Sequence, residues 1–560
     1  MNAPLKLRFG LPDRKWIGYS IAIVVVMISL RFLLNGNMGE INELDLLPLA
    51  RQFVNPDWVP SDWYLNQPAP YRFLFQIWAG RMIEAWGFLA ASIVGRLTCY
   101  GLVATGLVLI QRRLGLSLPL FLPAVAWMLY INGGRGLIAR EWIVDALESK
   151  AVAYGFVMLG IAALLYGRYR WVAFCLGLAT SFHVLVGGWT SLAVFMWGVW
   201  RRQQVRLSRF QWLQGLLIYL VSSAAAINAI LRQLLSPRLE TEVSSSLLYV
   251  FVRLSHHLNP LSWNPIWIAG FVVYMGLLIG SILFLRRRFL RQTDSSQRLV
   301  RVSLPSFQAE QFLAQKTLFE FTLMALVPFV LSVPIAWFDS QGTLLQLYWA
   351  RVGDVMLPLN TTLLVSCAVQ QGASAKVLPW IKMTCIAGIV VLMSLQLVVF
   401  QQQLAALKNF PNTDPDVQAI ATWLKNYTPQ ETVVITPPVE LNEFTWLSER
   451  GTIAKFKLMP QNNASIVEWY RRLRDLSGGV FPIPADYRLD KIRTGIMQAL
   501  TDGYNRLTPQ QVEALMQQYS ADYFLTPSSL PLDLPIAHRA GKLTLYHQPG
   551  THAHSPTRSP

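Results

Sequence analysis

Long apolar runs separated by short polar turns dominate the first 400 residues of the chain. A run of about 20 such residues is long enough to cross a bilayer as a helix. Runs of this kind fall near residues 16–35, 90–111, 116–132, 150–167, 171–185, 187–200, 210–230, 265–285, 318–337, 352–370 and 378–400. The pattern predicts an α-helical polytopic membrane domain over residues 1–400, with about 10–12 spans.

The pattern changes from Asp414 onward. Val417, Ile420 and Leu424 recur at helical spacing, and residues 432–436 form a short β-branched run that ends at two prolines. Residues 464–476 and 507–519 have the spacing of amphipathic helices. This predicts a soluble α/β domain over residues 401–549, followed by a disordered tail at 550–560.

The composition agrees with a membrane protein. Hydrophobic residues make up 53% and charged residues 14% of the chain, and the mean hydropathy is +0.36, which excludes an ordinary soluble protein. The net charge of +17 does not predict nucleic-acid binding, because Lys and Arg cluster in short turns beside apolar runs. The four cysteines lie inside apolar runs without metal-like spacing, so neither a disulfide framework nor a zinc site is expected.

The positions of the basic turns predict the topology. Lys6, Arg8, Arg14 and Lys15 precede the first run, which predicts a retained anchor in the plasma (inner) membrane with a cytoplasmic N-terminus. Counting passes then places four loops on the opposite, extracytoplasmic face together with the C-terminal domain. These loops are residues 36–89, 132–149, 231–264 and 338–351.

Three acids, Glu40, Glu43 and Asp45, follow the first span directly. Carboxylates at a membrane face are costly unless they serve a ligand or a partner. Glu43 and Asp45 could hold a divalent cation such as Mg or Mn, or one of them could act as a general base. The alternative is a solvated loop whose acids favour the start of a helix over residues 44–54. The helical run at 72–88 is expected to lie along the membrane plane.

A basic group lies in the third outer loop. Arg253, His256 and His257 could bind an anionic phosphate, and adjacent histidines point to opposite sides of an extended segment, so one of the two would face the ligand. The alternative is an interfacial loop that meets lipid headgroups. Further candidates are ionisable residues near the ends of spans or in the other loops: Arg140, Glu148, Lys150, His183, Arg351, Asp62 and, in the C-terminal domain, Arg450.

The order of these features resembles the GT-C class of membrane glycosyltransferases. The resemblance rests on a basic N-terminus, one span, an acidic outer loop with an interfacial helix, many further spans and a C-terminal extracytoplasmic domain. Glu43-Leu44-Asp45 matches the acidic Glu-x-Asp motif of that class in the first outer loop. The chain also looks like multi-spanning bacterial proteins with a His-His-Leu-x-Pro loop, and it has no strict Trp-Trp-Asp box.

The resemblance implies a polyprenyl-phosphate-linked sugar donor and an inverting transfer to an acceptor. The acidic motif, including Glu40, would supply a base or metal site. Arg253, His256 and His257 would hold the donor phosphate, with Arg351 and Arg140 as further phosphate ligands. Two other classes of function stay open: a transporter or flippase of a lipid-linked or anionic solute, and a non-catalytic membrane assembly protein. A transporter should contain paired broken helices and a repeat, and the bend expected at Gly187-Gly188 is its main support.

Overall fold

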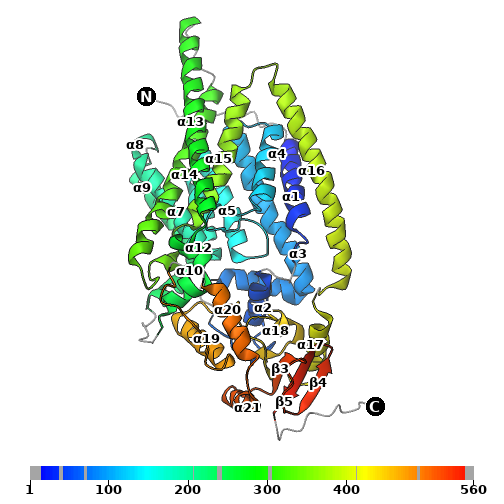
Figure 1. Cartoon of the computed structure of the whole chain (residues 1–560). Helices are drawn as coiled ribbons and strands as arrows, with labels where there is room; N and C mark the ends of the chain where they lie inside the picture. The colour runs from blue at the N-terminus through cyan, green and yellow to red at the C-terminus, as the bar shows by residue number, and fades with distance from the viewer. Residues whose placement is uncertain are drawn as a thin grey trace.

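The structure is a computed structural model that describes residues 14–36, 42–68, 72–205, 207–235, 243–299, 306–411, 413–488 and 492–548. Glu40 and the tail predicted at 550–560 lie outside these ranges. Figure 1 shows two regions, a layer of long helices and a smaller mixed domain at one end of that layer. The predicted combination of a helical polytopic membrane domain and a C-terminal α/β domain is confirmed.

Six helices in the described ranges are long and apolar enough to cross a membrane. They are α1 (Arg14–Phe32), α3 (Phe73–Leu114), α13 (Pro265–Leu299), α14 (Ser306–Phe338), α15 (Arg351–Gly372) and α16 (Leu378–Ala406). The pair α9 (Arg209–Ser222) and α10 (Ala224–Leu235), bent by 66°, makes a seventh if it is one span. The predicted number of about 10–12 spans is larger because it counts shorter helices as passes.

These shorter helices fill the interior of the membrane domain. Each of the predicted apolar runs overlaps a helix, and the shorter ones are α4 (Leu118–Ala126), the π-helix η1 (Trp127–Ile131), α5 (Ser149–Leu165), α6 (Tyr169–Phe182) and α7 (Val184–Trp200). The buried residues of α5, which include Tyr154 and Met158, belong to the same apolar core as those of α3. The bend expected at Gly187-Gly188 lies instead at His183, where α6 ends and α7 begins.

Two helical segments lie between the spanning helices and the C-terminal domain (Figure 1). One is α2 (Glu43–Val54), and the other is the first part of α3. Gly87 interrupts α3 with φ 77° and ψ 172°, a conformation that favours glycine, and the helix changes direction there. The first part of α3 matches the run at 72–88 that was predicted to lie along the membrane plane.

The C-terminal domain contains a five-stranded sheet in the order β2-β1-β3-β5-β4. β1 (Val433–Ile435) is parallel to β2 (Gly451–Thr452) and β3 (Tyr523–Pro527), whereas β5 (Leu543–His547) is antiparallel to β3 and to β4 (Ile536–Ala540). The helices are α17 (Pro415–Tyr427), α18 (Phe444–Ser448), α19 (Asn463–Leu476), α20 (Arg493–Tyr504) and α21 (Pro509–Gln518). The predicted helices at 416–425, 464–476 and 507–519 and the predicted strand at 432–436 are confirmed.

The core of this domain continues into the membrane domain. Trp469 and Leu473 of α19 belong to the same apolar cluster as Leu248 and Phe251 of the third outer loop. That loop contains α11 (Ser245–Leu247), the π-helix η2 (Leu248–Arg253), α12 (Ser255–Leu258) and the 3-10 helix η3 (Pro260–Ser262). The remaining short helices are α8 (Arg202–Val205), η4 (Leu345–Leu347) and η5 (Leu407–Asn409). The shared core fixes the C-terminal domain on the loops beneath it.

Candidate functional site

The two acids of the Glu-x-Asp motif face different surroundings. They are two residues apart on α2, which turns their side chains about 200° around the helix. Glu43 is fully buried, and its Oε1 accepts hydrogen bonds from Arg96 Nε and Leu147 N, both at 2.7 Å. Its Oε2 accepts from Ser92 Oγ at 2.8 Å. Glu43 therefore joins α2 to the spanning part of α3 and to the loop before α5.

Asp45 faces the C-terminal domain and the third outer loop. Its Oδ1 accepts a hydrogen bond from the hydroxyl of Tyr64. Burial raises the pKa of Asp45, while the charges of Arg72, Arg253 and Lys457 act in the opposite direction. We call these five residues, Asp45, Tyr64, Arg72, Arg253 and Lys457, the Asp45 cluster. It combines one carboxylate with three cations.

Arg253 is the central cation of this cluster. It is the last residue of the π-helix η2, and its Nη2 donates to the carbonyl oxygen of Lys457 at 2.9 Å. Its guanidinium carbon lies 5.9 Å from the ring centroid of Phe456. Burial lowers the pKa of Arg253, and the charge of Asp45 opposes that shift. Its Nε is buried and has no hydrogen-bond partner in the described part of the chain.

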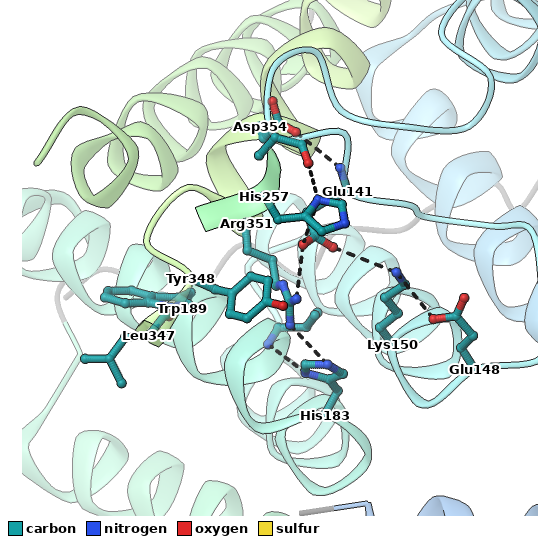
Figure 2. Close-up of polar contacts among 12 residues, drawn as sticks. Glu141, Glu148, Lys150, His183, Trp189, His257, Leu347, Tyr348, Arg351 and Asp354 are labelled. Carbon is teal, nitrogen blue, oxygen red and sulfur yellow. Dashed lines mark hydrogen bonds and ion pairs between the residues drawn. The ribbon is translucent and has the colours of Figure 1, made fainter. Parts of the chain in front are cut away.

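Figure 2 shows a second charged group, which surrounds Glu141. Arg351 Nη2 binds Glu141 Oε1 at 3.0 Å, and Arg351 Nη1 lies 3.1 Å from His183 Nε2. Lys150 Nζ is 3.9 Å from Glu141 Oε2 and 3.3 Å from Glu148 Oε2. We call these five residues the Glu141 network. Burial would raise the pKa of Glu141, but the charges of Arg351, Lys150 and His257 lower it to about 2.

Contacts connect this network to Asn42, the residue before the Glu-x-Asp motif, and to Arg253 of the Asp45 cluster. Asn42, directly before α2, donates to Glu148 Oε1 at 3.0 Å. The guanidinium of Arg351 lies 3.7 Å from the ring centroid of Tyr348, and the hydroxyls of Tyr348 and Tyr249 are 3.4 Å apart. Both tyrosines act electrostatically on Arg253. The Asp45 cluster and the Glu141 network are therefore adjacent.

The adjacent histidines divide between two environments. His257 Nδ1 contacts the carbonyl oxygen of Ala139 and lies 4.0 Å from Glu141 Oε1. Burial lowers the pKa of His257 to about 4, against the charge of Glu141. Burial and the charges of His257, Arg493 and Arg253 lower the pKa of His256 to about 2. Both imidazoles are therefore neutral at pH 7, and His256 is the one beside the arginines.

The other predicted residues lie outside these two groups. Arg140 has φ 57° and stacks on Trp267, with 5.2 Å between its guanidinium carbon and the ring centroid. Asp62 accepts hydrogen bonds from Leu65 N at 2.8 Å and Thr452 N at 2.9 Å, so it fastens the first outer loop to β2. Arg450 donates to Thr428 O at 2.6 Å and to Lys425 O at 3.0 Å, which closes the end of α17.

The metal site predicted on Glu43 and Asp45 does not fit this arrangement. The oxygens of Glu43 accept bonds from Arg96, Ser92 and Leu147. In the described ranges no group of three or more His, Cys, Asp or Glu residues could hold a metal ion.

Comparison with known proteins gives a family of undescribed function and a distant structural likeness. Residues 415–476 match the family described as Domain of unknown function (DUF6798). The chain is similar to the crystal structure of ArnT from Cupriavidus metallidurans in the apo state, with 11% identity, a TM-score of 0.37, and coverage of 95% of this chain and 98% of that one. It is also similar to the same protein bound to undecaprenyl phosphate, with 12% identity, a TM-score of 0.38, and coverage of 96% and 98%. No curated protein matches the chain.

Four residues near the candidate site were not predicted as site residues from the sequence: Tyr64, Arg72, Lys457 and Arg493. Arg72 stands directly before the in-plane helix, and Lys457 belongs to the basic segment Lys455-Phe456-Lys457. An isolated basic residue at the start of an interfacial helix was a usable signal for Arg72. Lys457 and Arg493 come from the C-terminal domain, and only the packing of that domain brings them to the loops.

Proposed function

We propose that this chain is a GT-C-type glycosyltransferase that transfers a sugar from a polyprenyl-phosphate-linked donor to an acceptor hydroxyl. Asp45 acts as the general base, and Arg72, Arg253 and Lys457 bind the donor phosphate. The reaction takes place at the extracytoplasmic face of the plasma (inner) membrane, and the N-terminus is cytoplasmic. The bilayer, the lipid-linked donor and the acceptor are the partners.

The observation that carries the proposal is the convergence of Asp45 with three cations from distant parts of the chain. Arg72 precedes α3, Arg253 ends η2, and Lys457 follows β2, yet all three act on the charge of Asp45. An inverting transfer needs a carboxylate that takes the acceptor proton on one side of the anomeric carbon and cations that stabilise the leaving phosphate on the other side. Figure 1 shows α2, the helix that carries Asp45, between the spanning helices and the C-terminal domain.

The proposed reaction is a single displacement at the anomeric carbon. The acceptor oxygen attacks from the side opposite the phosphate and forms the new bond to carbon. The bond between carbon and the phosphate oxygen breaks, and that oxygen keeps the electron pair. Asp45 takes the proton of the acceptor hydroxyl, and the three cations stabilise the charge on the leaving phosphate.

Glu43 and the Glu141 network act as positioning groups in this proposal. Glu43 holds α2 against Arg96 and Leu147, which directs Asp45 toward the cations. Arg351 is bound to Glu141 and His183, so it orders the loop before α5 and stays outside the set of phosphate ligands.

The test is a comparison of two carboxylate-to-amide variants in cells that lack the native gene. Mass spectrometry of the lipid extract measures the lipid-linked sugars that accumulate without transfer. Asp45→Asn should accumulate them like the empty vector, since a general base contributes about a hundredfold to ten-thousandfold in rate. Asp57→Asn, an exposed acid of the same loop, is the matched control and should behave like the wild type.

A binding measurement separates loss of the base from loss of the site. Purified Asp45→Asn should bind undecaprenyl phosphate as the wild type does, since the cations remain. Wild-type transfer by Asp45→Asn would contradict the assignment of the base. Failure of the wild type to bind undecaprenyl phosphate would contradict the proposed donor class.

A further inference from the structure

The segment before α20 contacts the outer loops of the membrane domain. Tyr487 packs on Phe251 with ring centroids 5.2 Å apart, and its hydroxyl donates to Ser340 O at 2.8 Å. Asn259 Nδ2 donates to the carbonyl oxygen of Arg488 at 2.7 Å. These contacts bring the first residue of α20, Arg493, to the end of η2.

Arg493 and Arg253 each have a buried Nε without a hydrogen-bond partner in the described part of the chain. These Nε atoms donate to no acceptor in the described ranges, and neither arginine forms an ion pair with an acid there. Burial and the charge of Arg253 lower the pKa of Arg493 to about 10. Two guanidinium groups whose charges act on one another repel each other unless an anion lies between them.

Arg253 connects Arg493 to the proposed base. The charge of Asp45 acts on Arg253, whereas the charge that acts on Arg493 is that of Arg253. Neutral His256 adjoins both arginines, and its ring is 4.0 Å from that of His257. Arg253 therefore interacts electrostatically with both the carboxylate and Arg493.

Guanidinium pairs favour phosphate, because each presents planar N–H donors that fit two phosphate oxygens. The proposed function assigns the donor phosphate to Arg72, Arg253 and Lys457, so Arg253 would contact both phosphate groups. We propose that Arg253 and Arg493, with His256 beside them, bind a second phosphate group at the joint between the membrane domain and the C-terminal domain. This inference rests on the proposed function for the position of the first phosphate.

The second phosphate could belong to a diphosphate carrier lipid or to a separate molecule, and a binding experiment distinguishes the two sources. The full chain in detergent is titrated with undecaprenyl diphosphate and with undecaprenyl phosphate at low salt. Phosphorus NMR then measures whether inorganic phosphate binds to protein already saturated with undecaprenyl phosphate. The variants are Arg493→Gln and Arg493→Lys, with Arg506→Gln, an exposed arginine of the same domain, as the matched control.

If the carrier lipid supplies the second phosphate, the wild type should bind undecaprenyl diphosphate at least about tenfold more tightly than undecaprenyl phosphate. One charge-assisted hydrogen bond to the second phosphate contributes about that factor in affinity. Arg493→Gln should remove this difference and leave the affinity for undecaprenyl phosphate unchanged, which also shows that the variant is folded. Arg493→Lys should keep part of the difference. If a separate molecule supplies it, the two lipids bind equally, and inorganic phosphate binds the loaded wild type and the loaded Arg506→Gln variant but not loaded Arg493→Gln.

The proposal is overturned if neither the diphosphate preference nor the binding of inorganic phosphate depends on residue 493. Its failure is distinct from failure of the proposed function. Loss of the second site leaves the binding of undecaprenyl phosphate and the effect of Asp45→Asn intact, whereas an error in the proposed function removes both.

Discussion

Glu43 and Asp45 are separated by one residue, yet their surroundings give them different chemistry. Glu43 is fully buried and bonded to Arg96, Ser92 and Leu147. Asp45 is half-buried and faces Arg72, Arg253 and Lys457. The sequence identifies both as candidates, but only the packing of α2 distinguishes an anchor from an available base.

Removing Glu43 should destabilise the protein, because Arg96 would keep a buried charge without its partner. Glu43→Ala is expected to cost roughly 3–5 kcal/mol in the free energy of unfolding. SDS-induced unfolding in mixed micelles, followed by tryptophan fluorescence, measures this cost. The double change Glu43→Leu and Arg96→Met should recover most of the stability, and Asp45→Asn should change it little. A stable Glu43→Ala variant would contradict the role of the ion pair.

The raised pKa of Asp45 predicts how the transfer rate falls at low pH. Transfer needs the ionised carboxylate, so the rate should fall as the pH drops through the folded-state pKa, which lies above the ordinary value of 3.8. Arg72→Gln removes a charge that lowers this pKa, so its acid limb should move to higher pH than that of the wild type. If the acid side of the pH–rate profile is the same in Arg72→Gln as in the wild type, the group that titrates there is not Asp45.

At the scale of elements, periodicity predicts the amphipathic segments well and the short strands poorly. The in-plane helix before Gly87, α17, α19, α21 and β1 all follow from apolar spacing. The strands β2 and β4 were not predicted, because β2 is two residues long and β4 is largely exposed, so neither has a distinct pattern. The β4–β5 hairpin had a local signal, Gly541 at φ 47° before the alternating Leu543-Thr-Leu-Tyr run.

The loop that carries Glu141 depends on a glycine. Gly136 N donates to Glu141 O at 2.7 Å, and a Cβ at position 136 would lie 1.9 Å from Asp354 Oδ2. Gly136→Ala should therefore displace the loop and destabilise the protein by about 1–3 kcal/mol, as overpacking does. The same SDS unfolding measures this change. Gly188→Ala, where a Cβ would meet nothing within 4 Å, is the control and should unfold like the wild type.

At the scale of the whole molecule, three of the predicted outer loops and the C-terminal domain meet at one face, as counting passes predicts. Asn42 contacts Glu148, His257 contacts Ala139, and Arg253 contacts Lys457. The fourth loop joins through Tyr348, beside Tyr249. The contribution of Lys457 and Arg493 could not be predicted, since it depends on how the domain docks.

The proposed orientation predicts which positions are accessible from outside the cell. Cysteine at Asp57 or at Asp502 should react with a membrane-impermeant maleimide in spheroplasts, because both lie on the side of the site. Cysteine at Arg286, an exposed position in the part of α13 that the proposed orientation assigns to the cytoplasm, should react only after the membrane is opened. The native cysteines Cys99, Cys175 and Cys367 are buried and should give little background. If only one of positions 57 and 502 is labelled in intact spheroplasts, the two positions do not lie on the same face of the membrane, which would contradict the proposed orientation.

The central claim is that Asp45 and the surrounding cations form the site of a lipid-linked phosphate. A cryo-EM structure of the full chain in nanodiscs with undecaprenyl phosphate tests it most directly. The account predicts phosphate density in contact with Arg253 and at least one of Arg72 and Lys457, on the side of α2 that carries Asp45. Phosphate density at the cytoplasmic ends of the helices, or a lipid phosphate away from Arg253, would contradict it.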